Sequence, residues 1–156
     1  MQIRRADKRD MDAVNRLLYQ VLALHAEIRP DLFIAGTKKY TDSELEEIFA
    51  SDRTPVFVAT DDADEIQGYC FCELQERKGS NNMQDRKTLY IDDLCVDQAA
   101  RGTHIGRTLY EYVLDYARQQ GCYNVTLNVW EGNDRARAFY DHMGFGIQKT
   151  LLEKIL

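Results

Sequence analysis

The stretch that decides the fold is Arg101-Gly102-Thr103-His104-Ile105-Gly106. It lies between an apolar, β-like run from Leu89 to Val96 and an amphipathic helical pattern that begins at Ile105. A strand, a tight glycine-containing turn and a helix N-terminus leave backbone N–H groups without internal partners, pointing the same way. The helix dipole adds partial positive charge, worth roughly 0.3–1 kcal/mol per favourable anion contact. The sequence therefore predicts an anion site, for which a diphosphate is the natural ligand.

The elements around this turn alternate between strand and helix. After it, the spacing of apolar residues predicts a helix over 105–120 that ends at Gly121 and a strand over 123–129. A helix over 133–143 and one last strand, or two short ones, over 145–156 complete the chain. Glycines directly after the last helical residue are typical helix ends.

Before the turn, the pattern predicts a short strand, two helices and three strands. Asp7 or Asp10 caps the first helix, and Arg29-Pro30 ends it. Thr41 or Ser43 caps the second helix, where Thr41-Asp42-Ser43-Glu44 fits a capping box. The strands are expected over 3–5, 55–60, 66–74 and 88–96, with a polar loop over 76–86. The order β-αα-βββ-αβαβ predicts an α/β fold: one mixed central sheet of six to seven strands flanked by about four helices. Residues 1–156 are expected to form a single domain.

Composition excludes several classes of protein. The chain has 20 basic and 26 acidic residues, a net charge of −6, which argues against a nucleic-acid partner. The N-terminus lacks the apolar core of a signal peptide, and no apolar run is long enough to span a bilayer, so no membrane association is expected. The cysteines at 70, 72, 95 and 122 match no zinc pattern, so no metal is expected. They are interpreted as reduced thiols of a cytoplasmic protein.

Two groups of residues resemble motifs of the GCN5-related N-acetyltransferase (GNAT) superfamily. Ile91-Asp92-Asp93-Leu94-Cys95-Val96, followed after four residues by the turn, resembles motif A, which reads Arg/Gln-x-x-Gly-x-Gly/Ala. Asn133 with Ala136-x-x-Phe139-Tyr140-x-x-x-Gly144-Phe145 resembles motif B. His104 stands where the family usually has glycine, and histidine tolerates left-handed backbone better than most side chains. Two motifs in the right order and on the right elements are a specific signal.

The resemblance implies that acetyl-CoA is the acetyl donor. Its diphosphate would lie on the turn, and its pantetheine arm would pair with the backbone of the preceding strand. One N–H near Leu94 or Cys95 would stabilise the oxyanion. The positions implied in cofactor binding are Leu94, Cys95, Val96, Arg101, Gly102, Thr103, His104, Ile105, Gly106, Arg107, Asn133 and Tyr140.

Tyr140 and Asn133 lie seven residues apart and share one face of the predicted helix. In the family the tyrosine protonates the leaving thiolate and the asparagine binds the cofactor arm. The structural alternatives are a core aromatic residue for Tyr140 and a plain helix cap for Asn133, which does not exclude a contact with the cofactor.

An amine acceptor arrives protonated and must lose a proton before it attacks the thioester. Asp92 and Asp93 are the candidate bases, expected to point to opposite sides of their strand. Tyr90 to Val96 is similar to the Tyr-Leu-Glu-Asp-Phe-Phe-Val strand of spermidine/spermine N-acetyltransferases, which implies Asp92 as the base. The alternative for both is a carboxylate paired with Arg or Lys. Glu73 is a reserve candidate, and its alternative is a solvated strand end.

The acceptor pocket is expected where the first two helices join. Polar and aromatic residues gather at that bend, namely His25, Glu27, Arg29, Asp31 and Phe33. The alternative is a solvated helix end with a proline-stopped turn. Trp130 is expected to pack beneath the splayed strand rather than to form a substrate cage.

Two classes of function remain. The first is an acetyl-CoA-dependent N-acetyltransferase acting on a primary amine of a small molecule, a polyamine, a lysine-like group or a peptide. The second is an acyl-CoA-binding sensor without turnover, which would need neither Tyr140 nor the Asp92/Asp93 pair. A P-loop nucleotide binder is excluded, because no Gly-Lys-Ser/Thr follows the turn. The family often dimerises, and Leu151 to Leu156 could supply a strand to a partner.

Overall fold

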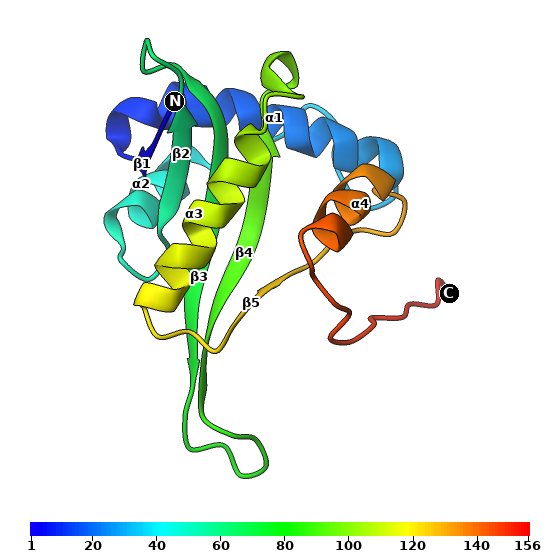
Figure 1. The fold of residues 1–156 in the computed structure, drawn as a ribbon. Helices are drawn as coiled ribbons and strands as arrows, with labels where there is room; N and C mark the ends of the chain where they lie inside the picture. Colours follow the sequence, from blue (N-terminus) through cyan, green and yellow to red (C-terminus); the bar gives the residue numbers. More distant parts are fainter.

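One mixed sheet organises the protein in the computed structural model, which describes all 156 residues. The strands follow one another across the sheet in chain order (Figure 1). Neighbouring strands are antiparallel except for the last pair, which is parallel. The strands are β1 (Gln2–Arg5), β2 (Val56–Thr60), β3 (Ile66–Arg77), β4 (Arg86–Val96) and β5 (Asn124–Leu127).

Helices cover both faces of this sheet. Helix α3 (Ile105–Gln119) crosses one face, and α1 (Met11–Ile28) and α2 (Asp42–Ala50) cover the other (Figure 1). Helix α4 (Asp134–His142) follows β5. Short 3₁₀ turns, η1 (Lys8–Asp10) and η2 (Gln98–Ala100), precede α1 and the anion turn. No helix is long and apolar enough to cross a membrane.

Each face has its own apolar core. The core under α1 and α2 includes Val14, Leu17 and Leu45, all fully buried. The core under α3 includes Leu89, Leu109 and Val113, also fully buried. Burying a Leu or Val side chain stabilises the fold by roughly 1.5–3 kcal/mol. The sheet therefore packs against helices on both faces, which fixes the position of β4 between the two helical layers.

Three helix ends lie where the sequence predicts them, whereas Asp10 precedes α1 without a side-chain cap hydrogen bond and Asp7 caps η1. Thr41 accepts a hydrogen bond from the Glu44 amide, and Glu44 accepts one from the Thr41 amide, so the capping box forms. Helix α1 ends at Ile28, directly before Arg29-Pro30. Gly121 has φ +74° after α3, a left-handed conformation that glycine adopts without steric cost.

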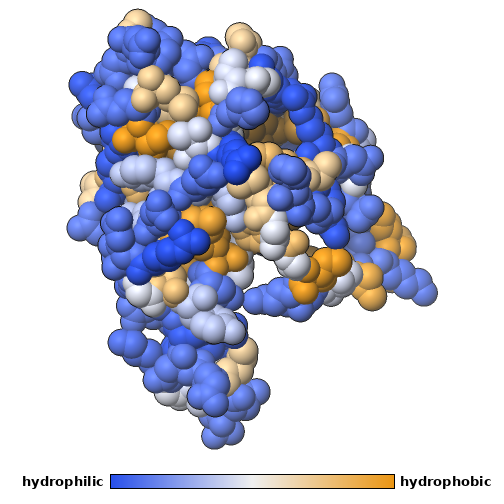
Figure 2. Space-filling view, in the orientation of Figure 1, coloured by the Kyte–Doolittle hydropathy of each residue, from blue (hydrophilic) through white to orange (hydrophobic).

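The prediction of six to seven strands is not confirmed, because the sheet has five. The predicted C-terminal strands over 145–156 do not form. Residues 146–156 run as an extended arm in which every residue is exposed, and none makes a backbone hydrogen bond. A strand needs a neighbouring strand to accept its N–H groups, and the arm meets none within this chain. Apolar side chains are visible along the arm where it leaves the body (Figure 2).

Candidate active site

The turn between η2 and α3 presents a row of free backbone donors. Gly102 has φ +84° and His104 has φ +62°, both left-handed, so the chain reverses sharply before Ile105. The backbone N–H groups of residues 103–107 donate to no acceptor in the protein. Because these amides lie at the positive end of α3, they form a concave site for an anion. This geometry fits the diphosphate that the sequence predicts.

His104 occupies its left-handed position without a side-chain hydrogen bond. Gly at this position removes the Cβ strain, whereas a β-branched residue raises it by roughly 1–2 kcal/mol. We expect His104→Val to weaken coenzyme A binding about tenfold and His104→Gly to leave it within threefold. Calorimetric titration of both variants measures this difference. Equal affinities would show that the left-handed turn does not organise the site.

A β-bulge in β4 brings two carboxylates to one face of the sheet. Phe71 of β3 pairs with Asp93, but the next residue, Cys72, pairs with Ile91, so Asp92 has no partner in the register. An extra residue in one strand shifts the alternation of side chains by one position. Asp93 therefore turns to the α1–α2 face instead of the α3 face. The expectation that Asp92 and Asp93 point to opposite sides is wrong, because it assumed an unbroken strand.

Two side chains of the loop between α1 and α2 contact Asp92. Lys39 Nζ lies 2.9 Å from Asp92 Oδ1, and the Tyr40 hydroxyl donates to Asp92 Oδ2. The Tyr40 ring stacks on Phe71 at 5.6 Å between centroids. Burial raises the pKa of Tyr40 well above its usual value, and the hydrogen bond to Asp92 raises it further, so the hydroxyl keeps its proton. Lys39 and Tyr40 were missed at the sequence level, since nothing in a loop pattern links them to a strand over fifty residues away.

Asp93 is more enclosed and has no cation bonded to it. The Tyr69 hydroxyl donates to Asp93 Oδ2 at 2.7 Å. Burial raises the pKa of Asp93 to about 6, although the hydrogen bond from Tyr69 and the charge of Lys39 act in the opposite direction. A carboxylate with this pKa is ionised at neutral pH and accepts a proton more readily than an ordinary aspartate.

The edge of β4 loses its β5 partner directly after Ile91, at these carboxylates. Strands β4 and β5 pair only from Thr88↔Asn124 to Ile91↔Leu127. Beyond Ile91, the segment that contains Leu94, Cys95 and Val96 pairs with β3 alone. The backbone on its other side is thus without a strand partner, next to the anion turn. This is the position at which the sequence predicts the cofactor arm.

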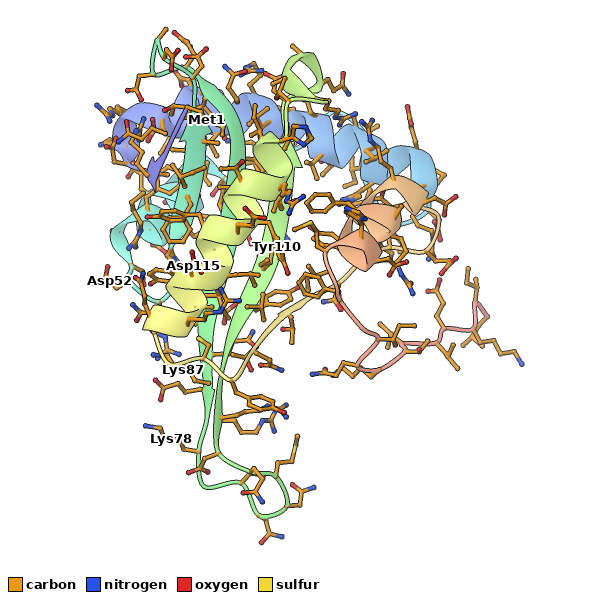
Figure 3. The ribbon with its side chains drawn as sticks, in the orientation of Figure 1. Met1, Asp52, Lys78, Lys87, Tyr110 and Asp115 are labelled. Atoms are coloured by element: carbon orange, nitrogen blue, oxygen red, sulfur yellow. The ribbon has the colours of Figure 1, made fainter.

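Tyr140 faces this region from α4. It is 9% exposed, and its hydroxyl makes no hydrogen bond within the protein. Burial raises its pKa well above the usual value, with smaller contributions from Cys70 and Asp93. Its ring packs against Phe139 and Phe145, within the aromatic group that also includes Tyr110 of α3 (Figure 3).

Asn133 caps α4. Its Oδ1 accepts a hydrogen bond from the Ala136 amide at 3.3 Å. This is the helix cap that the sequence offers as one interpretation of Asn133. Its amide nitrogen makes no hydrogen bond within the protein. Capping therefore leaves the Asn133 donor free for a ligand.

The residues predicted at the α1–α2 bend do come together. His25 packs against Phe33 at 5.2 Å, and Phe33 meets Trp130 edge-on at 5.3 Å. Arg29 lies over the Trp130 ring and pairs with Asp31. Burial, followed by the charge of Lys39, lowers the pKa of His25, so the ring is neutral at pH 7. Trp130, expected to pack beneath the sheet, is 39% exposed and joins this group.

Glu73 lies apart from the two aspartates. It faces Tyr90 across the β3–β4 ladder, is exposed, and makes no hydrogen bond or ion pair. Lys39 links the two groups of predicted site residues, because it pairs with Asp92 and its charge acts on His25, which packs against Phe33. Glu73 lies on the solvated part of β3.

The end of the β4–β5 pairing beside a turn of free amides agrees with what the resemblance of the two motifs implies. A family model described as "Acetyltransferase (GNAT) family" matches residues 20–145. The chain therefore belongs to the acetyltransferase (GNAT) family.

Individual relatives agree with this assignment. A 5-NmdU N-acetyltransferase of Pseudomonas phage PaMx11 is 31% identical over 130 residues, covering 80% of this chain and 84% of the relative. The crystal structure of a mutant BH1408 protein from Bacillus halodurans is 35% identical and superposes with a TM-score of 0.96, covering 100% of this chain and 99% of that one. An aminoglycoside N-acetyltransferase, AAC(6')-Iy in complex with CoA, shares the fold at 15% identity, with a TM-score of 0.74 and coverage of 99% and 98%.

Proposed function

We propose that the protein transfers the acetyl group of acetyl-CoA directly to a primary amine, of a cationic small molecule such as a polyamine or of a lysine-like or peptide group. The observation that carries this proposal is the bulge in β4. It sets a carboxylate of raised pKa, Asp93, beside the open strand edge and the turn of free amides. The N-acetyltransferase names of relatives support it as well.

Backbone groups of this chain that have no partner in the protein support acetyl-CoA as the acetyl donor. The amides of residues 103–107 would hold the diphosphate, and the open edge at Leu94 to Val96 would hold the pantetheine arm. Acetyl-CoA, when bound, supplies the thioester. A backbone N–H near Leu94 or Cys95 would stabilise the oxyanion.

Asp93 acts as the base in this proposal, rather than Asp92. Asp92 is already paired with Lys39 and accepts a hydrogen bond from Tyr40, so both of its oxygens are occupied by side chains of this protein. Asp93 takes a proton from the acceptor's ammonium group, directly or through water, and the free amine attacks the thioester carbonyl. The Tyr140 hydroxyl gives its proton to the departing thiolate.

The position of Lys39 favours a cationic acceptor. Lys39 places a primary ammonium 2.9 Å from Asp92, and its charge also acts on Asp93 and His25. The aspartate pair therefore already accommodates an ammonium group in this chain. The rings of Phe33 and Trp130, which contact each other beside His25, suit the apolar part of an amine.

The raised pKa values of two buried thiols support direct transfer to the amine, without an acyl-cysteine intermediate. Burial raises the pKa of Cys95 to about 12 and raises that of Cys70 well above its usual value. Buried thiols that stay protonated are inert as nucleophiles. The acyl group therefore passes to the amine in one ternary complex.

The alternative, a silent acyl-CoA sensor, is not favoured. A binding module gains nothing from an enclosed carboxylate whose ionised form is destabilised by burial, and such groups occur preferentially at catalytic sites. Thiol release from acetyl-CoA, measured over polyamines, amino acids, aminoglycosides and lysine peptides, distinguishes the two. We expect release that depends on the acceptor and is fastest with cationic primary amines. Binding of coenzyme A with no acceptor-dependent release would establish the sensor.

A further inference from the structure

Lys39 brings a primary amine of this chain into the group of residues that the proposed function uses. Its Nζ lies 2.9 Å from Asp92 Oδ1, and its charge also acts on Asp93, the carboxylate assigned as the base. A lysine side chain ends in the same kind of alkyl ammonium group as the acceptors proposed above. The site therefore contains an amine of its own.

Tyr40 holds the loop that presents Lys39. Its hydroxyl donates to Asp92 Oδ2, and its ring stacks on Phe71 of β3 at 5.6 Å between centroids. The residue directly after Lys39 is thus anchored to the same carboxylate and to the sheet. This anchor keeps the Lys39 backbone beside Asp92, so the ion pair does not depend on the long side chain alone.

Lys38, the residue before, points to a different part of the fold. Its Nζ donates to Asn15 Oδ1 at 2.7 Å and pairs with Asp42 of α2. Two adjacent lysines with the same chemistry therefore have separate partners, and only Lys39 contacts the aspartate pair. Lys38 is the matched control for any reaction of Lys39.

The Lys39 amine also lies at the correct end of the open strand edge. The pairing of β4 with β5 ends at Ile91, and Asp92 is the next residue. Leu94 to Val96, to which the pantetheine arm would pair, follow directly. An ammonium group bonded to Asp92 is therefore close to the strand segment along which the acetyl group would be delivered.

We propose that the site acetylates Lys39 of its own chain, an inference that rests on the acetyl transfer proposed above. Asp93 takes a proton from the ammonium, Nζ bonds to the acetyl carbon, and the carbon–sulfur bond breaks with its electron pair passing to sulfur. Tyr140 gives its proton to the sulfur and takes the remaining extra proton from the acetylated nitrogen. Asp93 then returns its proton to water, so the products are a neutral amide, the free thiol of coenzyme A and one proton.

Incubation of the full chain with acetyl-CoA, without any added amine, tests the proposal. We expect about one thiol released per chain, and peptide mass spectrometry should find at least about ten times more acetyl on Lys39 than on Lys8 or Lys78. Those two side chains are 84% and 76% exposed, against 44% for Lys39, so uncatalysed acetylation in solution would favour them. Labelling that follows exposure would overturn the proposal.

Conservative substitutions of the two adjacent lysines provide the comparison. Arginine keeps a positive charge beside Asp92, but its guanidinium group stays protonated and does not attack a thioester. Lys39→Arg should therefore abolish the release of one thiol per chain, and Lys38→Arg should keep it within about twofold. A release that survives in Lys39→Arg contradicts the proposal.

A mixture of two proteins tests whether the transfer occurs within one chain. Isotope-labelled Asp93→Asn protein is incubated with unlabelled wild type and acetyl-CoA, and the Lys39 peptides of both are compared. We expect acetyl on the wild-type peptide at a level at least about ten times that of the variant. Equal labelling would mean that one protein acetylates another, which the position of Lys39 in its own site does not predict.

His25 gives a readout that does not depend on turnover. Burial and then the charge of Lys39 lower the pKa of His25, and acetylation removes that charge. The pKa of His25, followed by NMR titration, should therefore be higher in the acetylated protein than in the unmodified one. An unchanged value in protein acetylated at Lys39 would show that this lysine does not lie at the site.

Failure of this inference is distinguishable from failure of the proposed function. Rapid thiol release with added amines, while Lys39 stays unmodified, would reject self-acetylation and leave the acetyltransferase activity in place. No thiol release with any amine, together with no label on Lys39, would reject both.

Discussion

Replacing Asp93 with asparagine is expected to lower kcat/KM for the amine by about 10²–10⁴, the usual contribution of a general base. The loss should exceed that of Asp92→Asn at least tenfold, since Asp92 is occupied by Lys39 and Tyr40. In the wild type, kcat/KM should rise with pH through about 6, the pKa of Asp93, as the carboxylate loses its proton. Steady-state thiol release at several pH values measures all three effects. An equal or larger loss in Asp92→Asn would assign the base to Asp92.

The same substitution should increase stability, which separates its catalytic effect from simple damage. The pKa of Asp93 is about 6 in the fold and near 3.8 in the unfolded chain. The protonated form therefore stabilises the fold below pH 3.8, and this contribution is lost as pH rises through 6. Asparagine stays neutral, so at pH 8 it removes a penalty of about 1–3 kcal/mol, less any weakening of the bond from Tyr69.

Thermal unfolding measures this gain. We expect the Tm of Asp93→Asn to exceed that of the wild type by roughly 3–6 °C at pH 8 and to match it near pH 4. A lower Tm at pH 8 would mean that the charged carboxylate stabilises the fold, in conflict with the direction of its pKa shift.

Tyr140→Phe is expected to lower kcat about 10–100-fold while the Kd for coenzyme A changes less than threefold. The substitution removes only the hydroxyl, which has no hydrogen bond in the protein, so the fold loses no contact. The leaving thiolate then lacks its proton donor, although a thiolate is a tolerable leaving group, which limits the loss. Steady-state kinetics together with calorimetry separate the two quantities.

Tyr110→Phe is the matched control. Tyr110 is also buried, at 4% exposed, and packs against the same aromatic residues from α3. It should keep kcat within twofold. Equal losses in both variants would assign Tyr140 to packing, the structural alternative for that residue.

Local sequence signals predicted most of the fold. The capping box at Thr41, the stop at Arg29-Pro30 and the glycine after α3 act within a few residues, so a single sequence suffices to place them. The anion turn is equally local: its glycine and the start of the following helix mark it in the sequence, and Gly102 and His104 both have positive φ in the structure. The identity of the bound group came from the resemblance of the motifs, since a turn alone suits many anions.

Features that depend on contacts between distant parts of the chain could not be predicted from the sequence. The bulge at Asp92 arises from the register of β4 against β3, and no residue type in Ile91 to Leu94 marks it. Lys39 and Tyr40 reach the aspartates from another element, across more than fifty positions. The absent sixth and seventh strands have a similar explanation: residues 145–156 have strand-like composition, but they pair with no strand of their own chain.

Calorimetric titration with coenzyme A and with pantetheine, which lacks the diphosphate, tests most directly whether the amides of residues 103–107 hold that group. We expect coenzyme A to bind with a micromolar Kd and pantetheine at least a hundredfold more weakly, because the free N–H donors at the start of α3 would then lack an anion. Equal affinities for the two ligands, or no heat with coenzyme A on folded protein, would contradict the assignment of this turn as the cofactor site.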